Sequence, residues 1–240
     1  MKALANVLPG DAIVRLQCLI ILIVAVVFSA LLGSRFFSVA NFQSIGSQLP
    51  VLGMLALGMG MTMLTGGINL SIIAGANACS LLMAAIIVSH PDNPLFLLLA
   101  LLAGAALAIA IGALNGMLIA WVGVSPILAT LGTMTLISGL NILLSDGSVI
   151  SGFPTIIQSL GTGAVAGIPV ALLLFFAVAL LLWVLLEHTT LGRSLYLVGS
   201  NEQATRYSGV NTVRVQIAVY VISALLGWLA AILMMAKFNS

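Results

Sequence analysis

Long apolar stretches separated by short polar intervals dominate the pattern along the chain. A helix that crosses the hydrocarbon core of a bilayer needs about 20 mainly apolar residues. About seven runs approach or exceed this length, and the pattern predicts one transmembrane helix for each. The runs are Leu16 to Gly33, Ser47 to Leu64, Ile68 to Ser89, Leu95 to Val122, Pro126 to Leu144, Ile168 to Leu186 and Val215 to Ala236. The predicted fold class is therefore all-α, a polytopic membrane helix bundle.

The composition excludes a soluble enzyme and a disordered chain. Hydrophobic residues make up 62% of the sequence and charged residues only 5%, whereas soluble domains average roughly a quarter charged. So few charges cannot cover a surface exposed to water. The formal net charge is +2, with no basic tract that would bind nucleic acid. We therefore expect an integral membrane protein in contact with lipid and no nucleic-acid partner.

Basic residues at the ends of the runs orient the bundle, because cytoplasmic loops carry an excess of Lys and Arg. With the N-terminus in the cytoplasm, most of the seven basic residues lie inside. The inside set is Lys2, Arg15, Arg193, Arg206 and Arg214, and the outside set is Arg35 and Lys237. The same orientation leaves Asp92 and Asp146 in outer loops. The sequence therefore predicts a cytoplasmic N-terminus.

The runs carry no Asp, Glu, Lys, Arg or His away from their ends. This argues against a proton relay, and less strongly against sodium coupling through carbonyls and hydroxyls. Glu187 and His188 are the only acidic residue and histidine that are directly adjacent in the sequence, and no nucleophile lies near them. Neither Cys18 nor Cys79 pairs with a histidine at metal-ligand spacing. We therefore expect no enzyme activity, no catalytic residue, no metal site and no cofactor.

Small residues recur at every fourth position in the run Leu95 to Val122, namely at Gly104, Ala108, Gly112 and Gly116. This spacing places them in one stripe along a helix, where they allow another helix to approach closely. We interpret the stripe as ordinary packing within the bundle. A helix that lines a pathway or a subunit interface is the alternative.

Paired glycines interrupt the pattern between the second and third runs, in the segment from Thr65 to Ser71. Asn69 or Ser71 can cap the helix that follows. The polar backbone of a helix interrupted inside a membrane must be satisfied by protein or by a water-filled cavity. A simple tight turn and a role in a solute pathway therefore remain equally open for this segment.

Hydroxyl groups mark the fifth run, which starts with Pro126 in its first turn, where proline is well tolerated. Thr130 and Thr133 share a helix face, whereas Thr135 points elsewhere. These hydroxyls could contact a polar solute or bond the backbone carbonyl one turn earlier, and we favour the second for most of them individually. The predicted substrate-pathway residues are Asn69, Ser71, Thr130 and Thr133.

The interval 187–214 is the only long polar stretch on the predicted cytoplasmic side. Ser200 and Gln203 have the spacing of a capping box. Glu202 suits the positive start of a short helix, and Gly209 suits its left-handed end. The pattern predicts a helix of about two turns from Asn201 to Ser208.

A helix this short is not stable alone in water, so something must hold it. It could pack against lipid or against its own bundle, or it could be presented to a cytoplasmic partner. The second interpretation is favoured because Ala204 and Tyr207 share one face that offers little apolar area to lipid.

Three stretches, in the expected order, resemble motifs of bacterial ABC-type sugar permeases, the family that serves ribose, xylose, galactose and related solutes. The first runs from Gly66 to Ser71, and the second from Asn115-Gly116 to Ala129-Thr130-Leu131-Gly132. The third is the cytoplasmic signature from Thr190 to Tyr196, followed by Gly199 to Glu202, Ala204, and Ser208 to Val210. The resemblance covers about Phe36 to Ser240 and does not distinguish one sugar from another.

This resemblance implies a multi-pass permease subunit of the bacterial inner membrane, with 1–240 forming one permease domain. Its implied partners are a cytoplasmic ATP-binding subunit, a periplasmic solute-binding protein and a second permease subunit, identical or different. The sequence contains no Gly-x-x-x-x-Gly-Lys-[Ser/Thr] phosphate loop, so ATP binding of that kind must come from a partner. Within the cytoplasmic coupling segment 187–214, the implied ATPase-coupling residues are Arg193, Asn201, Glu202, Ala204, Arg206, Tyr207 and Gly209.

Two departures from the family pattern stand out. The family usually has Asp where this chain has Asn69, so a role that requires a carboxylate there is in doubt. Family members also continue through further spans, so the chain resembles the N-terminal three-quarters of a permease, and we expect little transport by 1–240 alone. A non-transporting membrane scaffold and a stand-alone secondary carrier are the alternative functions.

Overall fold

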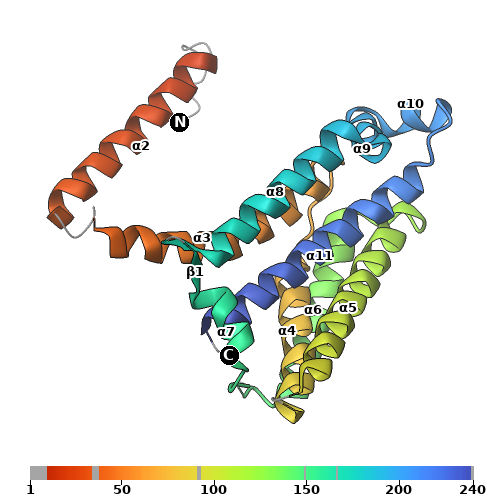
Figure 1. Cartoon of the computed structure of the whole chain (residues 1–240). Helices are drawn as coiled ribbons and strands as arrows, with labels where there is room; N and C mark the ends of the chain where they lie inside the picture. The colour runs from red at the N-terminus through yellow and green to blue at the C-terminus, as the bar shows by residue number, and fades with distance from the viewer. Residues whose placement is uncertain (1–9, 34–37, 91–92, 149, 166, 239–240) are drawn as a thin grey trace. The chain divides into compact units, whose positions relative to one another are not determined.

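The computed structural model describes residues 10–33, 38–90, 93–148, 150–165 and 167–238. Helices form most of this part of the chain (Figure 1). The chain divides into two compact units, Met1–Ile45 and Gly46–Ser240. The first contains α2 (Gly10–Leu32) and the start of α3 (Val39–Met63). The second contains all the elements that follow and the residues that form the candidate site.

Six helices within the described residues are long and apolar enough to cross a membrane. They are α3, α4 (Ile72–Ser89), α5 (Pro94–Ala120), α6 (Pro126–Ser145), α8 (Val170–His188) and α11 (Thr212–Phe238). They correspond in order to six of the predicted runs. The largest difference in an end is at α3, which begins at Val39 rather than Ser47. The predicted polytopic all-α bundle is confirmed.

The first predicted run, Leu16 to Gly33, falls in α2, whose apolar part within the described side chains is the shorter segment Arg15–Ala30. Three residues that entered the predicted orientation, Lys2, Arg35 and Asp92, lie outside the described residues. The N-terminal orientation therefore stays a prediction.

Local sequence explains where two of the spanning helices begin. The Asn93 side chain accepts a hydrogen bond from the Leu95 N–H at 3.0 Å, and Pro94 occupies the first turn of α5. Pro126 takes the equivalent place in α6, directly after Ser125. Proline fits there because the first helical N–H has no intrahelical acceptor in any case.

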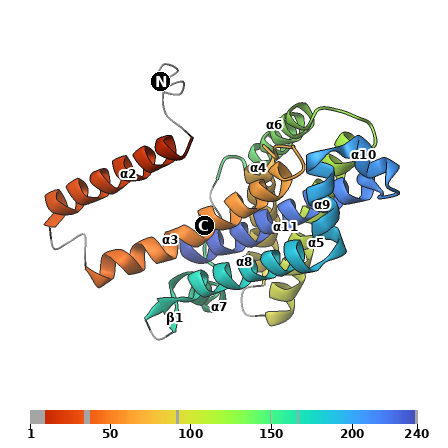
Figure 2. The ribbon, with the colours of Figure 1, turned by 90° about the horizontal axis from the view of Figure 1, so that it is seen from above.

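Helix α11 is the central element of the second unit. It packs against α4, α5, α7 (Thr155–Thr162) and α9 (Thr190–Ser200). Figures 1 and 2 show it running beside α4 and α5, with α8 on its other side. Its buried residues contribute to both of the large apolar clusters of the core: Val219 and Leu233 belong to one, and Ala231 and Met235 belong to the other.

The small-residue stripe of α5 is the contact surface for α11. A Cβ atom added at Gly112 would lie 2.6 Å from the Val221 Cα, and one at Gly116 would lie 2.6 Å from the Ile217 Cα. Only glycine therefore allows the two backbones to approach this closely. The interpretation of the stripe as packing within the bundle is confirmed for these two positions.

The connection between α6 and α8 has more structure than the sequence suggested. It contains α7, which packs on α11, and a hairpin of two short strands, β1 (Ala164–Val165) and β2 (Ile168–Pro169). The strands are antiparallel, with Ala164 opposite Pro169. Gly167 has a φ of +83°, which glycine adopts without strain.

Candidate functional site

The interruption between α3 and α4 is a tight, glycine-dependent turn. The Gly67 N–H donates to the Thr62 carbonyl at 3.0 Å, and Gly66 has a φ of +78°. The Thr65 hydroxyl also donates to the Thr62 carbonyl, at 2.9 Å. Gly67 lies so close to the Tyr220 hydroxyl on α11 that a Cβ atom would not fit. The predicted break at the paired glycines is confirmed.

Polar side chains on this turn and on three helices form one hydrogen-bonded network. The Asn69 Nδ2 donates to the Ser223 Oγ at 3.0 Å, and the Asn69 Oδ1 accepts from the Ser71 hydroxyl at 2.8 Å and from the Ser71 N–H at 3.1 Å. The Asn115 Nδ2 donates to the Ser71 Oγ at 2.8 Å. The Asn115 Oδ1 accepts from the Thr133 hydroxyl at 2.7 Å. We call these five residues the polar network.

The polar network is closed to solvent. Its members are at most 5% exposed, and a satisfied network in a medium of low dielectric rigidifies its surroundings. The cavity beside Asn69 and Ser71 has a volume of only about 10 Å³, which is close to the least that holds one water molecule. The structure thus brings three predicted pathway residues together, in mutual contact rather than along an open passage.

Thr130, the fourth predicted pathway residue, lies next to the same turn. Its hydroxyl is 3.0 Å from the Ile68 carbonyl and 2.7 Å from the Pro126 carbonyl one turn earlier. The Thr133 hydroxyl likewise lies 3.0 Å from the Ala129 carbonyl. Bonding to the preceding turn is confirmed for these threonines, and both also join α6 to its neighbours. Their role in solute passage stays a prediction.

A larger cavity of about 370 Å³ opens between α4, α6 and the C-terminal half of α11. We call it the outer cavity, after its predicted side of the membrane. Its polar lining residues are Asn77, Ser80, Asn141, Ser145 and Ser148. None of the described residues that line it is charged. The volume falls within the range of about 300 to 1,000 Å³ that is typical of small-molecule sites.

This cavity was not predicted from the sequence, although the sequence contains a signal for it. Asn77 and Ser80 lie three residues apart on α4, and Asn141 and Ser145 lie four apart on α6. Each pair therefore marks a polar stripe on one helix face. Only the packing of α4 against α6 shows that the two stripes line the same space.

A second cavity, of about 440 Å³, lies beside the N-terminal end of α11. Its polar lining side chains are Thr65, Ser125, Glu202, Gln216 and Tyr220, together with the backbone of Gly66 and Gly67. We call it the α10-end cavity, because Glu202 is the first residue of α10 (Glu202–Tyr207). Along α11 the polar network, at Ser223, falls between the two cavities.

The short helix α10 forms where it was predicted, but its cap is different. Asn201 is the capping residue, and its Oδ1 accepts from the Ala204 N–H at 3.0 Å. Ser200 does not cap α10, because it is still the last residue of α9 and its hydroxyl donates to the Leu197 carbonyl. The predicted capping box is therefore wrong. Gly209 has a φ of +84°, which confirms the predicted left-handed end.

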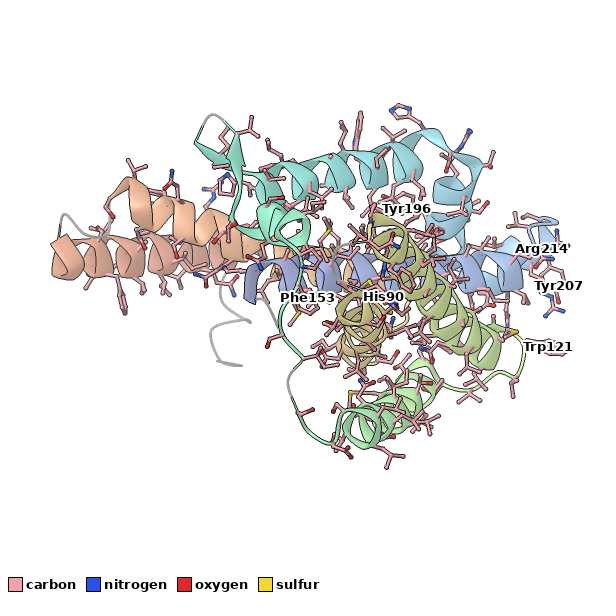
Figure 3. All side chains as sticks on the ribbon, turned by 60° about the horizontal axis from the view of Figure 1, so that its bottom comes forward. His90, Trp121, Phe153, Tyr196, Tyr207 and Arg214 are labelled. Atoms are coloured by element: carbon pink, nitrogen blue, oxygen red, sulfur yellow. The ribbon has the colours of Figure 1, made fainter. Side chains whose placement is uncertain are left out.

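Helix α10 is anchored on one side and exposed on the other. Thr205 is buried, and its hydroxyl donates to the Asn201 carbonyl at 2.8 Å. Tyr207 is 92% exposed, and in Figure 3 it projects from the same end of the molecule as Trp121 and Arg214. The other predicted coupling residues are also exposed: Arg193, Asn201, Glu202, Ala204, Arg206 and Gly209. The segment therefore presents a surface that no described residue covers.

Comparison with known proteins agrees with this architecture. Residues 41–240 match a family described as the permease component of the branched-chain amino acid transport system. The ribose import permease protein RbsC of Bacillus subtilis is 36% identical over 221 residues, which cover 91% of this chain and 67% of that protein. RbsC of Escherichia coli is 36% identical over 228 residues, covering 93% and 70% respectively.

The D-allose transport system permease protein AlsC of Escherichia coli is 29% identical over 221 residues, covering 92% of this chain and 67% of that protein. No solved structure matches the chain. The six apolar helices and the matched family together make it a multi-pass protein of the bacterial inner membrane. The chain belongs to the family of membrane permease components of transport systems that this match defines.

Proposed function

We propose that this chain is the membrane-spanning subunit of an ATP-driven importer that carries a monosaccharide or a similar small neutral polar solute. The relatives named for ribose import and D-allose transport support this substrate class. The outer cavity carries the proposal within the chain itself. Its amide and hydroxyl groups can exchange hydrogen bonds with sugar hydroxyls, and the absence of charge among its described lining residues suits a neutral solute.

The energy of ATP hydrolysis would be transmitted to this chain through α10. This chain has no phosphate loop of its own, so a cytoplasmic ATP-binding subunit would supply the energy. An exposed aromatic side chain on a short, capped helix suits a protein contact, because aromatic residues are enriched at interfaces. We propose that Tyr207, with Ala204 and Arg206 beside it, contacts that subunit, and that the N-terminus lies in the cytoplasm.

The remaining proposed partners follow from the same function. A periplasmic solute-binding protein would deliver the sugar to the outer end of the bundle. A second permease subunit, either another copy of this chain or a related one, would complete the membrane part. Lipid would cover the apolar faces of the spanning helices.

Uptake of labelled sugars tests the substrate class. Cells that express the chain with its cognate ATP-binding and solute-binding proteins should take up a labelled pentose or hexose in an ATP-dependent, saturable way. N77L, which replaces an amide in the outer cavity with an apolar side chain, should lower that uptake. T135V, which changes an exposed hydroxyl on α6 outside the cavity lining, should leave uptake unchanged. Equal uptake by both variants would contradict a role for the outer cavity.

Co-purification tests the contact with the ATP-binding subunit. Y207D should weaken recovery of that subunit while membrane insertion is retained, because Tyr207 is almost fully exposed. Y196D is the matched control, since Tyr196 is a partly exposed tyrosine on α9 rather than α10. If Y207D and Y196D recover the ATP-binding subunit equally well, the contact lies elsewhere.

A further inference from the structure

One residue that lines the α10-end cavity carries a buried hydroxyl with no hydrogen-bond partner among the described residues. Tyr220 is 1% exposed, and its hydroxyl makes no hydrogen bond with any described residue. An unsatisfied buried hydroxyl typically costs about 1 to 3 kcal/mol, so a native structure that keeps one requires an explanation. Tyr220 lines the cavity of about 440 Å³, and its hydroxyl lies against Gly67, which lines the same cavity.

Neighbouring residues create room for this hydroxyl rather than satisfying it. Gly67 approaches the hydroxyl so closely that any side chain would displace it. The turn that carries Gly67 also directs the Asn69 side chain to Ser223 and not to Tyr220. Tyr220 and Ser223 lie three residues apart on one face of α11, but the Tyr220 hydroxyl makes no hydrogen bond with the described residues of the polar network.

The lining residues define the chemistry of a ligand. Among the described residues that line the cavity there is no Lys or Arg, and the one charged group is the carboxylate of Glu202. An anion such as a phosphorylated compound is therefore disfavoured. A single carboxylate is also too few ligands for a divalent cation. The hydroxyls of Thr65 and Ser125 and the amide of Gln216 both donate and accept hydrogen bonds. This set suits a neutral molecule that carries several hydroxyl groups.

We propose that the α10-end cavity is a binding subsite for a monosaccharide, in which the Tyr220 hydroxyl hydrogen-bonds a sugar hydroxyl. The inference rests on the proposed function and deepens it, because it adds a second solute position at the opposite end of α11 from the outer cavity. The closed polar network lies between the two positions. In this conformation of the protein, a solute can occupy one cavity or the other, and the polar network blocks the direct route between them.

Protection of an introduced cysteine from alkylation tests the subsite. The full chain carries C18S and S125C, which places one exposed thiol on the cavity lining while Cys79 stays buried. Maleimide labelling is measured in membrane vesicles against increasing D-ribose, D-allose or D-galactose. At least one of these sugars should slow labelling of S125C several-fold. Ribose 5-phosphate and L-leucine should not. S208C, on the exposed end of α10, should label at the same rate with or without sugar.

Removal of the Tyr220 hydroxyl isolates its contribution. Y220F should raise the sugar concentration for half-protection by about five-fold, the usual effect of losing one neutral hydrogen bond. Folding should not be impaired, because Y220F removes no hydrogen bond to any described residue. Y196F, outside the cavity, should change nothing. E202Q, at an exposed position, should also weaken protection and provides a variant that does not disturb the core.

The outcomes separate this inference from the proposed function. Monosaccharide uptake without protection of S125C would overturn the subsite and leave the proposed function standing. Protection that is equal in Y220F would overturn the role of the hydroxyl. Protection by L-leucine but by no sugar would overturn the ligand class. Sugar protection in a chain that supports no sugar uptake would support the subsite and contradict the proposed transport.

Discussion

Removal of Asn115 from the polar network should destabilise the bundle by an amount that the hydrogen bonds predict. N115A removes the bond to the Ser71 hydroxyl and the bond from the Thr133 hydroxyl. Side-chain hydrogen bonds in membrane proteins average about 0.6 kcal/mol, with a maximum near 1.7. Ser71 keeps Asn69 as an acceptor and Thr133 keeps the Ala129 carbonyl. Neither hydroxyl is therefore left unsatisfied, and the loss should be about 1 to 3 kcal/mol with the new cavity included.

A double-mutant cycle isolates one bond from the cavity. T133V is nearly isosteric and removes the hydroxyl that donates to Asn115. The free energies of unfolding of the wild type, N115A, T133V and the double variant are measured by SDS-driven unfolding in mixed micelles. The coupling energy between Asn115 and Thr133 should be about 0.6 to 1 kcal/mol.

The control cycle pairs T133V with N141A. Asn141 donates to the Ala74 carbonyl and shares no partner with Thr133. The two residues lie eight positions apart on α6, or about 12 Å along its axis, so their effects should add within about 0.5 kcal/mol. A coupling energy between Asn115 and Thr133 that is no larger than this control would refute the network.

Three further predictions concern backbone contacts. G67A should cost about 1 to 3 kcal/mol of stability, because the new Cβ would clash with the Tyr220 hydroxyl. Adding Y220F should recover most of that loss, because the Tyr220 ring atoms lie at an ordinary contact distance from that Cβ; thermal unfolding of G67A, Y220F and the double variant measures both effects. N201A should speed tryptic cleavage within α10, because a capping asparagine contributes about 1 kcal/mol to helix stability, whereas S200A should leave the cleavage rate unchanged. Cleavage that S200A speeds as much as N201A does would contradict Asn201 as the cap. G112V should reduce the amount of folded protein recovered in detergent, because its side chain would meet the α11 backbone.

The positions of the spanning helices and of the break between α3 and α4 are readable from the sequence, because each depends on local composition. Apolar length alone marks the spanning helices from α3 to α11, and the paired glycines at Gly66 and Gly67 alone mark the turn between α3 and α4. The position and end of α10 follow equally from its own residues. The cap assignment failed only because Ser200 and Asn201 are both good capping residues, and the choice depends on where α9 stops.

The partners of the polar residues were decided by tertiary packing. Asn69, Asn115, Thr133 and Ser223 are far apart in sequence, and only the crossing of α4, α5, α6 and α11 makes each the hydrogen-bond partner of another in a closed network. The same crossing leaves the Tyr220 hydroxyl without a hydrogen-bond partner in the part of the chain that the structure describes, although Tyr220 lies one turn from Ser223. Periodicity identifies the face of a helix that a residue occupies. It does not identify which other helix that face meets, and this meeting decides whether a hydroxyl is bonded, buried alone or open to a cavity.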